Sequence, residues 1–266
     1  MRSDALKRGA LTDSGVFVKV SGEGPALILL HGLFGSLENL GGIARYLSKA
    51  FKVYSLDLPN HGRSRHVDDA SLASCVRQLK ACLDELHLSN VFMLGHSLGA
   101  KVAMELALTF PEYVQKLVVI DIAPVKYSSR HDKIFEGLLS LNLKALASRS
   151  EADKHLQLYE PEIAVRSFLL KNLVKDDNGH FFWRMNLPAI HKHYSNLIDG
   201  NTHTVYANPV LFLKGSDSDY VLEKYREDIV GRFPKVQLKV ISNTAHWLHA
   251  EKPEMVSNIV NRFLSD

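Results

Sequence analysis

The chain has 266 residues, of which 46% are hydrophobic and 23% are charged, the proportions of an ordinary globular protein. This composition excludes a disordered chain, a collagen-like chain and a disulfide scaffold, and the length allows a sizeable buried core. Lysine and arginine number 32 against 29 aspartates and glutamates, a formal charge of +3. No block of like charge occurs, so no nucleic-acid partner is predicted.

The cysteines and the first residues indicate the compartment. Cys75 and Cys82 fall within one predicted helix, where a rise of about 1.5 Å per residue separates them by roughly 10 Å. A disulfide requires Cα atoms within about 7 Å, so we expect two free thiols. The first residues lack the apolar core of a secretory signal, and no apolar run approaches the roughly 20 residues of a membrane span. These features predict a soluble, cytoplasmic protein.

Short apolar segments alternate with helical patterns along most of the chain. Apolar runs predict strands at 16–20, 26–30, 51–57, 91–94, 116–121, 210–213 and 236–241. Apolar residues at helical spacing predict helices at 70–87, at 97–110 and after Pro253. Several strands are apolar at nearly every residue, which is typical of strands covered on both faces. The alternation predicts an open, mostly parallel sheet with helices on both faces.

Between residues 124 and 208 the strand signals give way to helical ones. We expect helices at about 132–147, 151–158, 162–174 and 188–198, with a small turn or hairpin at 176–184. A helical insertion of this kind predicts a lid over the sheet edge where ligands bind. The predicted organisation is therefore a core segment at 1–123, a lid at 124–208 and a second core segment at 209–266. The lid residues Phe181, Phe182 and Trp183 are candidates for substrate contact or for the core of the lid.

The sequence G-H-S-L-G at 95–99 matches the G-x-S-x-G pattern of a nucleophile elbow. The pattern alone is a weak signal, because so short a motif often occurs by chance. Here an apolar strand precedes it and a helix follows, which is the context that the elbow requires. The flanking glycines allow the backbone to turn sharply around Ser97 without side-chain clashes. We therefore predict Ser97 as a nucleophile.

Two other turns carry the groups that a serine nucleophile needs. The glycine-rich turn at 31–35 follows an apolar strand and can direct backbone N–H groups at one point. The amides of Leu33 and Leu98 are the candidates for this oxyanion hole. His246 lies on a loop between the last strand and the last helix, from which it can reach over the sheet toward Ser97 as a general base.

Together these segments resemble the α/β-hydrolase fold over nearly the whole chain. The resemblance also includes D-L-P-N-H-G-R-S at 57–64 and A-H-W-L-H-A-E-K-P-E at 245–254. The chain is similar to small bacterial esterases in I-D-I-A-P at 120–124 and in L-F-G-S-L-E-N-L-G at 33–41. The resemblance implies a triad of the elbow serine, an acid and His246 that acts on small-molecule acyl esters or thioesters without a cofactor.

The acid is where the sequence departs from the commonest pattern of this fold. In most α/β-hydrolases the carboxylate follows the strand predicted here at 210–213, three residues after a glycine, and Ser218 occupies that position. Asp217 and Asp219 flank it and stay candidates. Asp121 ends the preceding strand, and we predict it as the acid, with Ser218 as a spectator or a second hydrogen-bond partner of the histidine. The alternative role of Asp121 is a structural cap on the turn into the lid.

Other activities stay open beside the esterase interpretation. The fold also hosts C–C bond hydrolysis, elimination reactions and non-catalytic ligand receptors. Within the esterases, Lys126, Arg130 and Lys133 near the lid entrance could meet the phosphates of an acyl-CoA thioester, or could simply form a solvated face. No metal site is predicted, because His191 and His193 stand outside any recognised metal-binding motif. The sequence leaves the acyl chain length, the leaving group and the oligomeric state open.

Overall fold

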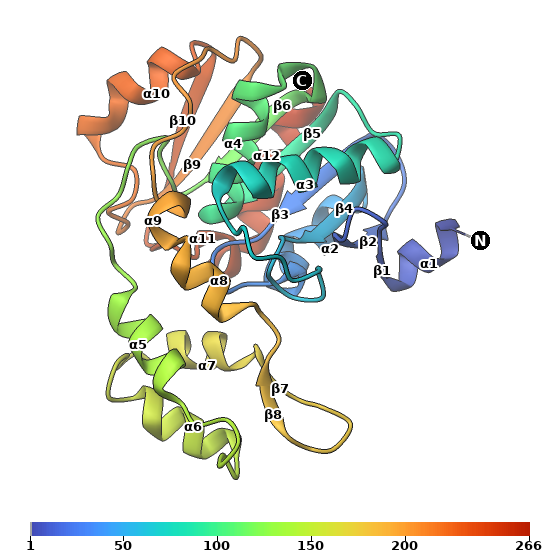
Figure 1. The fold of residues 1–266 in the computed structure, drawn as a ribbon. Coiled ribbons are helices and arrows are strands. Elements are labelled where there is room, and N and C mark those ends of the chain that lie inside the picture. Colours follow the sequence, from blue (N-terminus) through green and yellow to red (C-terminus); the bar gives the residue numbers. More distant parts are fainter. Residues whose placement is uncertain (1) are drawn as a thin grey trace.

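The computed structural model describes residues 2–266, which contain an eight-stranded sheet in the order β1-β2-β4-β3-β5-β6-β9-β10 (Figure 1). Neighbouring strands from β4 to β10 are parallel, while β1 and β2 form an antiparallel edge. The strands are β1 (Ala10–Leu11), β2 (Phe17–Ser21), β3 (Ala26–Leu30), β4 (Lys52–Asp57), β5 (Val91–His96), β6 (Val114–Ile120), β9 (Val210–Gly215) and β10 (Val236–Ile241). The predicted, mostly parallel sheet is confirmed.

Two layers of helices cover the sheet. On one face lie α3 (Leu72–Glu85), α4 (Leu98–Thr109) and α10 (Arg226–Arg232), and on the other α2 (Gly41–Leu47), α11 (Leu248–Glu251) and α12 (Pro253–Ser265). In β3, Ile28 and Leu30 pack into the first layer, whereas Leu27 and Leu29 pack into the second. Successive side chains point to opposite faces, and helices cover both faces. The central strands are therefore apolar at nearly every residue.

Several short elements have no clear signal in the sequence. These are α1 (Arg2–Arg8), β1, α2 and α10. Helix α2 begins with Gly41 and Gly42, which are poor helix formers, and it is held by packing of Ile43 and Leu47 in the cluster that includes α12. Tertiary packing therefore overrides local propensity here. Both cysteines are buried free thiols, as predicted.

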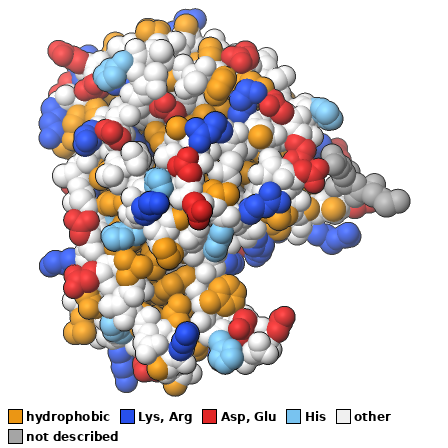
Figure 2. All heavy atoms as spheres, in the orientation of Figure 1, with side chains coloured by type: hydrophobic (Ala, Val, Ile, Leu, Met, Phe, Trp, Pro, Cys, Tyr) orange, Lys and Arg blue, Asp and Glu red, His pale blue; other side chains and the backbone are white. Residues whose placement is uncertain are grey.

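Residues 124–208 lie beyond the carboxyl ends of the strands. They form α5 (Asp132–Ser140), α6 (Arg149–Leu156), α7 (Ile163–Leu170), α8 (Leu187–Lys192), α9 (Tyr194–Leu197) and a hairpin of β7 (Leu173–Lys175) and β8 (Phe181–Trp183). Figure 1 places α8 and α9 next to the core, with α5, α6, α7 and the hairpin further out. Hydrophobic side chains gather over this segment on the face shown in Figure 2. In the described part of the chain, no helix is long and apolar enough to cross a bilayer.

Two of the four predicted helices of this segment were too long and a third is divided, while the helix expected at 151–158 is found at Arg149–Leu156. The helix expected at 132–147 ends at Ser140, and the one expected at 162–174 ends at Leu170. The reason in the second case is that residues 173–175 pair with 181–183 as a hairpin, a contact that helical spacing does not reveal. The helix expected at 188–198 divides into two at His193.

The turn from β5 into α4 leaves no space for a side chain at Gly99. A Cβ atom there would lie 2.2 Å from the carbonyl oxygen of Leu30 and 2.4 Å from that of His31. These are backbone atoms of the central sheet and cannot move aside. Gly99→Ala is therefore expected to lower the free energy of unfolding by about 4 kcal/mol or more, as measured by urea denaturation.

Gly231 is the matched control, because a Cβ atom there would have no neighbour within 4 Å. It lies within α10, so Gly231→Ala should raise stability by about 0.4–1 kcal/mol. Similar small effects of both substitutions would contradict the close packing at the turn.

Candidate active site

Ser97 occupies the turn between the end of β5 and the start of α4. Its φ of 52° and ψ of −118° lie outside the regions that an ordinary residue prefers, and such a conformation persists only where surrounding bonds impose it. Here the Ser97 amide donates to the carbonyl of Ile120 at 3.0 Å, and its own carbonyl accepts from the amides of Ala100 and Lys101. The turn therefore holds the serine side chain at the carboxyl edge of the sheet.

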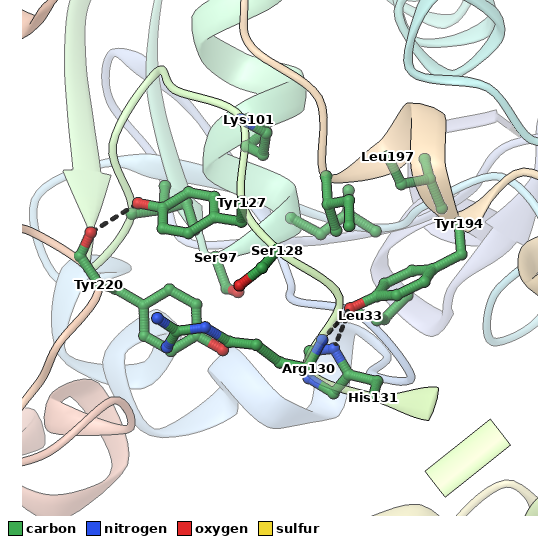
Figure 3. A pocket seen from close by; sticks show the side chains of 13 residues that line it. Leu33, Ser97, Lys101, Tyr127, Ser128, Arg130, His131, Tyr194, Leu197 and Tyr220 are labelled. Atoms are coloured by element: carbon green, nitrogen blue, oxygen red, sulfur yellow. Dashed lines mark hydrogen bonds between the residues drawn. The ribbon is translucent and has the colours of Figure 1, made fainter. Parts of the chain in front are cut away.

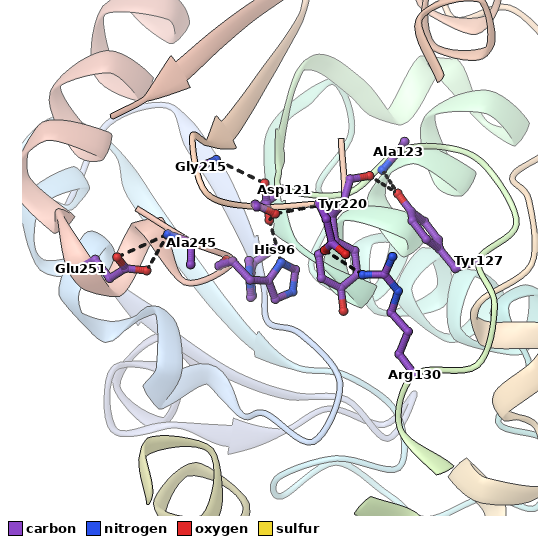
Figure 4. Close-up of polar contacts among 12 residues, drawn as sticks. His96, Asp121, Ala123, Tyr127, Arg130, Gly215, Tyr220, Ala245 and Glu251 are labelled. Atoms are coloured by element: carbon purple, nitrogen blue, oxygen red, sulfur yellow. Dashed lines mark hydrogen bonds and ion pairs between the residues drawn. The ribbon is translucent and has the colours of Figure 1, made fainter. Parts of the chain in front are cut away.

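Asp121 follows β6 at the same edge and is fully buried. One carboxylate oxygen, Oδ1, accepts from the amide of Gly215 at 3.2 Å. The other, Oδ2, lies 2.7 Å from Nδ1 of His246 and also accepts from the hydroxyl of Ser218. Both oxygens are thus hydrogen-bonded, which a buried carboxylate requires. Figure 4 shows these bonds converging on Asp121.

The aspartates that flank Ser218 lie elsewhere. Ser218 is buried, whereas Asp217 and Asp219 are exposed on either side of it. The carboxylate of Asp219 is paired with the guanidinium of Arg130 at 2.8 Å. The amide of Ser218 donates to the carbonyl of Gly215 at 3.2 Å in a tight turn, and in the described chain neither flanking carboxylate is hydrogen-bonded to His246. The structure therefore brings together Asp121, Ser218 and His246, and it leaves Asp217 and Asp219 outside.

The imidazole of His246 packs against two other rings. The ring of Tyr220 stacks on it with centroids 4.0 Å apart, and the ring of His96 lies at 4.7 Å. Because Nδ1 is bound to the Asp121 carboxylate, Nε2 is the nitrogen left to exchange a proton. Ser97 and His246 line the same cavity. No hydrogen bond joins their side chains among the described residues, and catalytic hydrogen bonds often tighten only when a substrate binds.

The turn after β3 is fixed by a neutral histidine. Nδ1 of His31 lies 2.8 Å from the carbonyl of Gly32, and its Nε2 accepts from the amide of Leu58 at 2.9 Å. Burial lowers the pKa of His31 to about 4, so the ring stays uncharged at neutral pH. Within residues 2–266 the amides of Leu33 and Leu98 have no hydrogen-bond acceptor, and Leu98 opens α4 at its partly positive end. Both amides are free to bind an oxyanion.

Two histidines behind the site were missed by the sequence analysis. His96 is buried between His246 and His249, with its Nε2 3.0 Å from the His246 carbonyl and its ring 4.1 Å from that of His249. Burial is the main cause of a low pKa in both residues. It lowers the pKa of His96 well below its usual value and the pKa of His249 to about 3. Both rings therefore stay neutral. Because His96 and His249 are far apart in the sequence, no sequence pattern predicts the contact of their rings. No group of three or more metal-ligating side chains in the described chain is arranged to hold an ion.

Ser97 lies where two cavities meet. The narrow one has a volume of about 40 Å³ and the wide one about 420 Å³. Leu33, Ser97 and His131 line both. The other residues of the narrow cavity come from α4, from α9 and the residue after it, from the segment after β6, and from the loop after β9, which contributes Tyr220. Figure 3 shows this lining around Ser97. The wide cavity runs from Ser97 past His246 to α7.

The aromatic residues of β8 were candidates for substrate contact or for the core of the lid, and they do not line this site. Phe181, Phe182 and Trp183 line neither cavity beside Ser97. The pairing of β8 with β7 directs them into the packing of the hairpin or toward solvent, and Phe182 is 43% exposed. The wide cavity is lined instead by apolar residues of α5 and α7, among them Ile134, Val165 and Phe168.

The chain matches the model of the α/β-hydrolase fold family over residues 25–253. It is 35% identical to "Esterase YbfF" of Escherichia coli, over 90% of this chain and 93% of that protein. It is also 35% identical to the mouse "sn-1-specific diacylglycerol lipase ABHD11", over 91% of this chain and 81% of that protein. The solved structure of a "Marine microorganism esterase" is 37% identical, with a TM-score of 0.91 over 93% of this chain and 98% of that chain. The chain belongs to the α/β-hydrolase fold family.

Neutral buried histidines make stability depend on pH. The folded-state pKa of His249 is about 3, below the 6.5 of an exposed histidine, so the unfolded chain binds the extra proton as the pH falls. Stability should therefore decrease from pH 6.5 to about pH 4, by up to about 1.4 kcal/mol per pH unit for each such histidine. Urea denaturation between pH 7.5 and 4.5 measures this slope.

His249→Phe should flatten the slope by the contribution of one proton, because it removes the titratable ring. The buried Nδ1 of His249 has no hydrogen-bond partner to lose. The control is His87→Asn at an exposed residue with a φ of 55°, which asparagine also tolerates. An unchanged slope in His249→Phe would show that His249 is not the neutral buried group described here.

Proposed function

We propose that this chain hydrolyses carboxylic esters or acyl thioesters through an acyl-enzyme formed on Ser97. As a member of a family whose similar proteins include esterases and lipases, it is a carboxylesterase-type hydrolase. Beyond this class of enzyme, we infer which residues are catalytic and that a covalent intermediate forms. The observation that carries it is the 2.7 Å contact between Nδ1 of His246 and the buried carboxylate of Asp121, at the edge where the elbow presents Ser97.

The first half-reaction transfers the acyl group. His246 takes the proton of the Ser97 hydroxyl at Nε2, and the serine oxygen attacks the carbonyl carbon of the ester. The amides of Leu33 and Leu98 bind the negative oxygen of the tetrahedral intermediate. Asp121 holds the imidazole in the tautomer with a proton on Nδ1 and stabilises the imidazolium. The imidazolium then gives its Nε2 proton to the departing alcohol or thiol.

Water completes the cycle by the same steps. His246 takes a proton from water, the hydroxide attacks the acyl-enzyme, and the carboxylic acid leaves as Ser97 regains its proton. Ser218 donates a hydrogen bond to the same Asp121 oxygen that contacts His246. Ser218 is thus a positioning residue that holds the carboxylate rather than a group that reaches the substrate.

The basic residues near the lid entrance give little support to an acyl-CoA substrate in particular. Lys126 lies 3.7 Å from the Asp199 carboxylate, and Arg130 is paired with Asp219 and also lies over the ring of Tyr220. Two of the three residues that could meet CoA phosphates are therefore engaged with acidic partners. A panel of esters and acyl-CoA thioesters distinguishes the two leaving groups.

Ser97→Ala is expected to abolish hydrolysis of p-nitrophenyl butyrate, because no nucleophile remains. A fluorophosphonate probe should label the wild-type chain at Ser97, as read by mass spectrometry, and should fail to label the variant. Ester turnover at the wild-type rate in Ser97→Ala would rule out the acyl-enzyme.

The acid is tested by a matched set of amide substitutions. Asp121→Asn should lower kcat by up to about 10⁴-fold, because the amide no longer stabilises the imidazolium. Ser218→Ala should have a mild effect, and Asp217→Asn and Asp219→Asn should stay nearly as active as the wild type. Loss of activity confined to either of the last two variants would transfer the role of the acid away from Asp121.

A further inference from the structure

We propose that the narrow cavity takes the acyl group and the wide cavity takes the alcohol or thiol, so that the preferred substrates combine a short acyl group with a bulky leaving group. This inference rests on the proposed acyl transfer at Ser97. It assigns the two cavities from the chemistry of the proton transfer and from their sizes.

The position of His246 decides which cavity holds the leaving group. In the first half-reaction the imidazolium must give its proton to the departing oxygen or sulfur, which has to lie within hydrogen-bond reach of the ring. His246 lines the wide cavity and is absent from the lining of the narrow one. The leaving group therefore extends into the wide cavity, and the acyl group is left with the narrow one.

The narrow cavity suits a short apolar chain. Its volume of about 40 Å³ is about a tenth of that of the wide cavity, about 420 Å³, so it accommodates a short chain only. Its lining beyond the nucleophile is mainly apolar and aromatic, and includes Leu98, Ile122, Tyr127, Leu197 and Ile198. An acyl chain of about two to four carbons fills this space.

Buried polar bonds hold the α4 wall of the narrow cavity, which includes Lys101. The buried Nζ of Lys101, one turn after Ser97, donates to the carbonyl of Val125 at 3.0 Å and to Oδ1 of Asn201 at 3.4 Å. The side-chain amide of Asn201 donates in turn to the Glu105 carboxylate at 2.9 Å. These bonds attach both ends of the lid segment to the helix that follows the nucleophile. The cavity therefore cannot lengthen without breaking buried hydrogen bonds.

The wide cavity is about ten times larger and has a mixed lining. Ile134, Val165 and Phe168 supply an apolar wall from α5 and α7, while Glu38 and Lys171 add charged groups. A cavity of about 420 Å³ falls within the range of small-molecule sites. It can therefore accept an aromatic or branched alcohol that also carries polar atoms.

Two substrate series separate the cavities. In the acyl series the leaving group is constant, with p-nitrophenyl esters from acetate to dodecanoate. In the leaving-group series the acyl group is constant, with methyl, benzyl and 1-naphthyl butyrate. For the wild type, kcat/KM should peak at acetate to butyrate and fall at least tenfold by octanoate, whereas it should fall little or not at all from methyl to naphthyl butyrate.

Ile198→Ala and Phe168→Ala form a matched pair, since both side chains are half-buried and each lines one cavity only. Ile198→Ala should raise kcat/KM for hexanoate and octanoate relative to acetate by about tenfold and leave the leaving-group series unchanged. Phe168→Ala should alter the leaving-group series alone. Ile198→Phe should restrict activity to acetate, which tests the same wall in the opposite direction. Phe182→Ala, which lines neither cavity, should change neither series.

The reverse result would overturn the assignment of the cavities. If Phe168→Ala shifted the acyl preference while Ile198→Ala shifted the leaving-group preference, the acyl group would lie in the wide cavity. A wild-type optimum at octanoate or longer would also refute the inference. Either outcome, together with an inactive Ser97→Ala variant, leaves the proposed function intact. Full activity in Ser97→Ala would instead refute the proposed function itself.

Discussion

The buried carboxylate of Asp121 joins three loops that lie far apart in the sequence. It follows β6, and it accepts hydrogen bonds from the turn after β9 through Gly215 and Ser218, while His246 comes from the loop after β10. A charge in this environment is tolerated only while its partners are in place, and removal of one partner leaves it uncompensated. The same bonds therefore hold three loops together and orient the imidazole.

Neutral groups surround this single charge. His96 and His249 lie behind His246, and burial lowers the pKa of each well below its usual value. They therefore add no positive charge beside the imidazole at neutral pH. When His246 becomes an imidazolium in the proposed reaction, the buried charge that its ring contacts is the carboxylate of Asp121. Packing of neutral rings thus supports the orientation of His246 and places no like charge beside it.

The lid segment is joined to the core by a second buried polar network. Asn201 donates from its amide to the backbone carbonyl of Lys101 and to Glu105, and the guanidinium of Arg232 donates to the Asn201 carbonyl. Buried polar groups stabilise a structure only where they are well partnered, so this network ties both ends of the lid to α4 in one arrangement. It also explains how a segment outside the sheet can define a small cavity beside Ser97.

The sequence by itself determined the sheet, the elbow at Ser97 and the candidate roles of His246 and Asp121, because these follow from local patterns: apolar runs, glycine spacing and the position of a residue at a strand end. Tertiary structure alone decided which carboxylate meets the imidazole, because that contact joins loops far apart in the chain. It also decided the contact of His96 with His249, because these residues are far apart in the sequence and no local pattern links them. The sequence left the role of the β8 aromatic residues open for the same reason, since the pairing of two short strands, not their hydrophobicity, determines where Phe181 and Phe182 point.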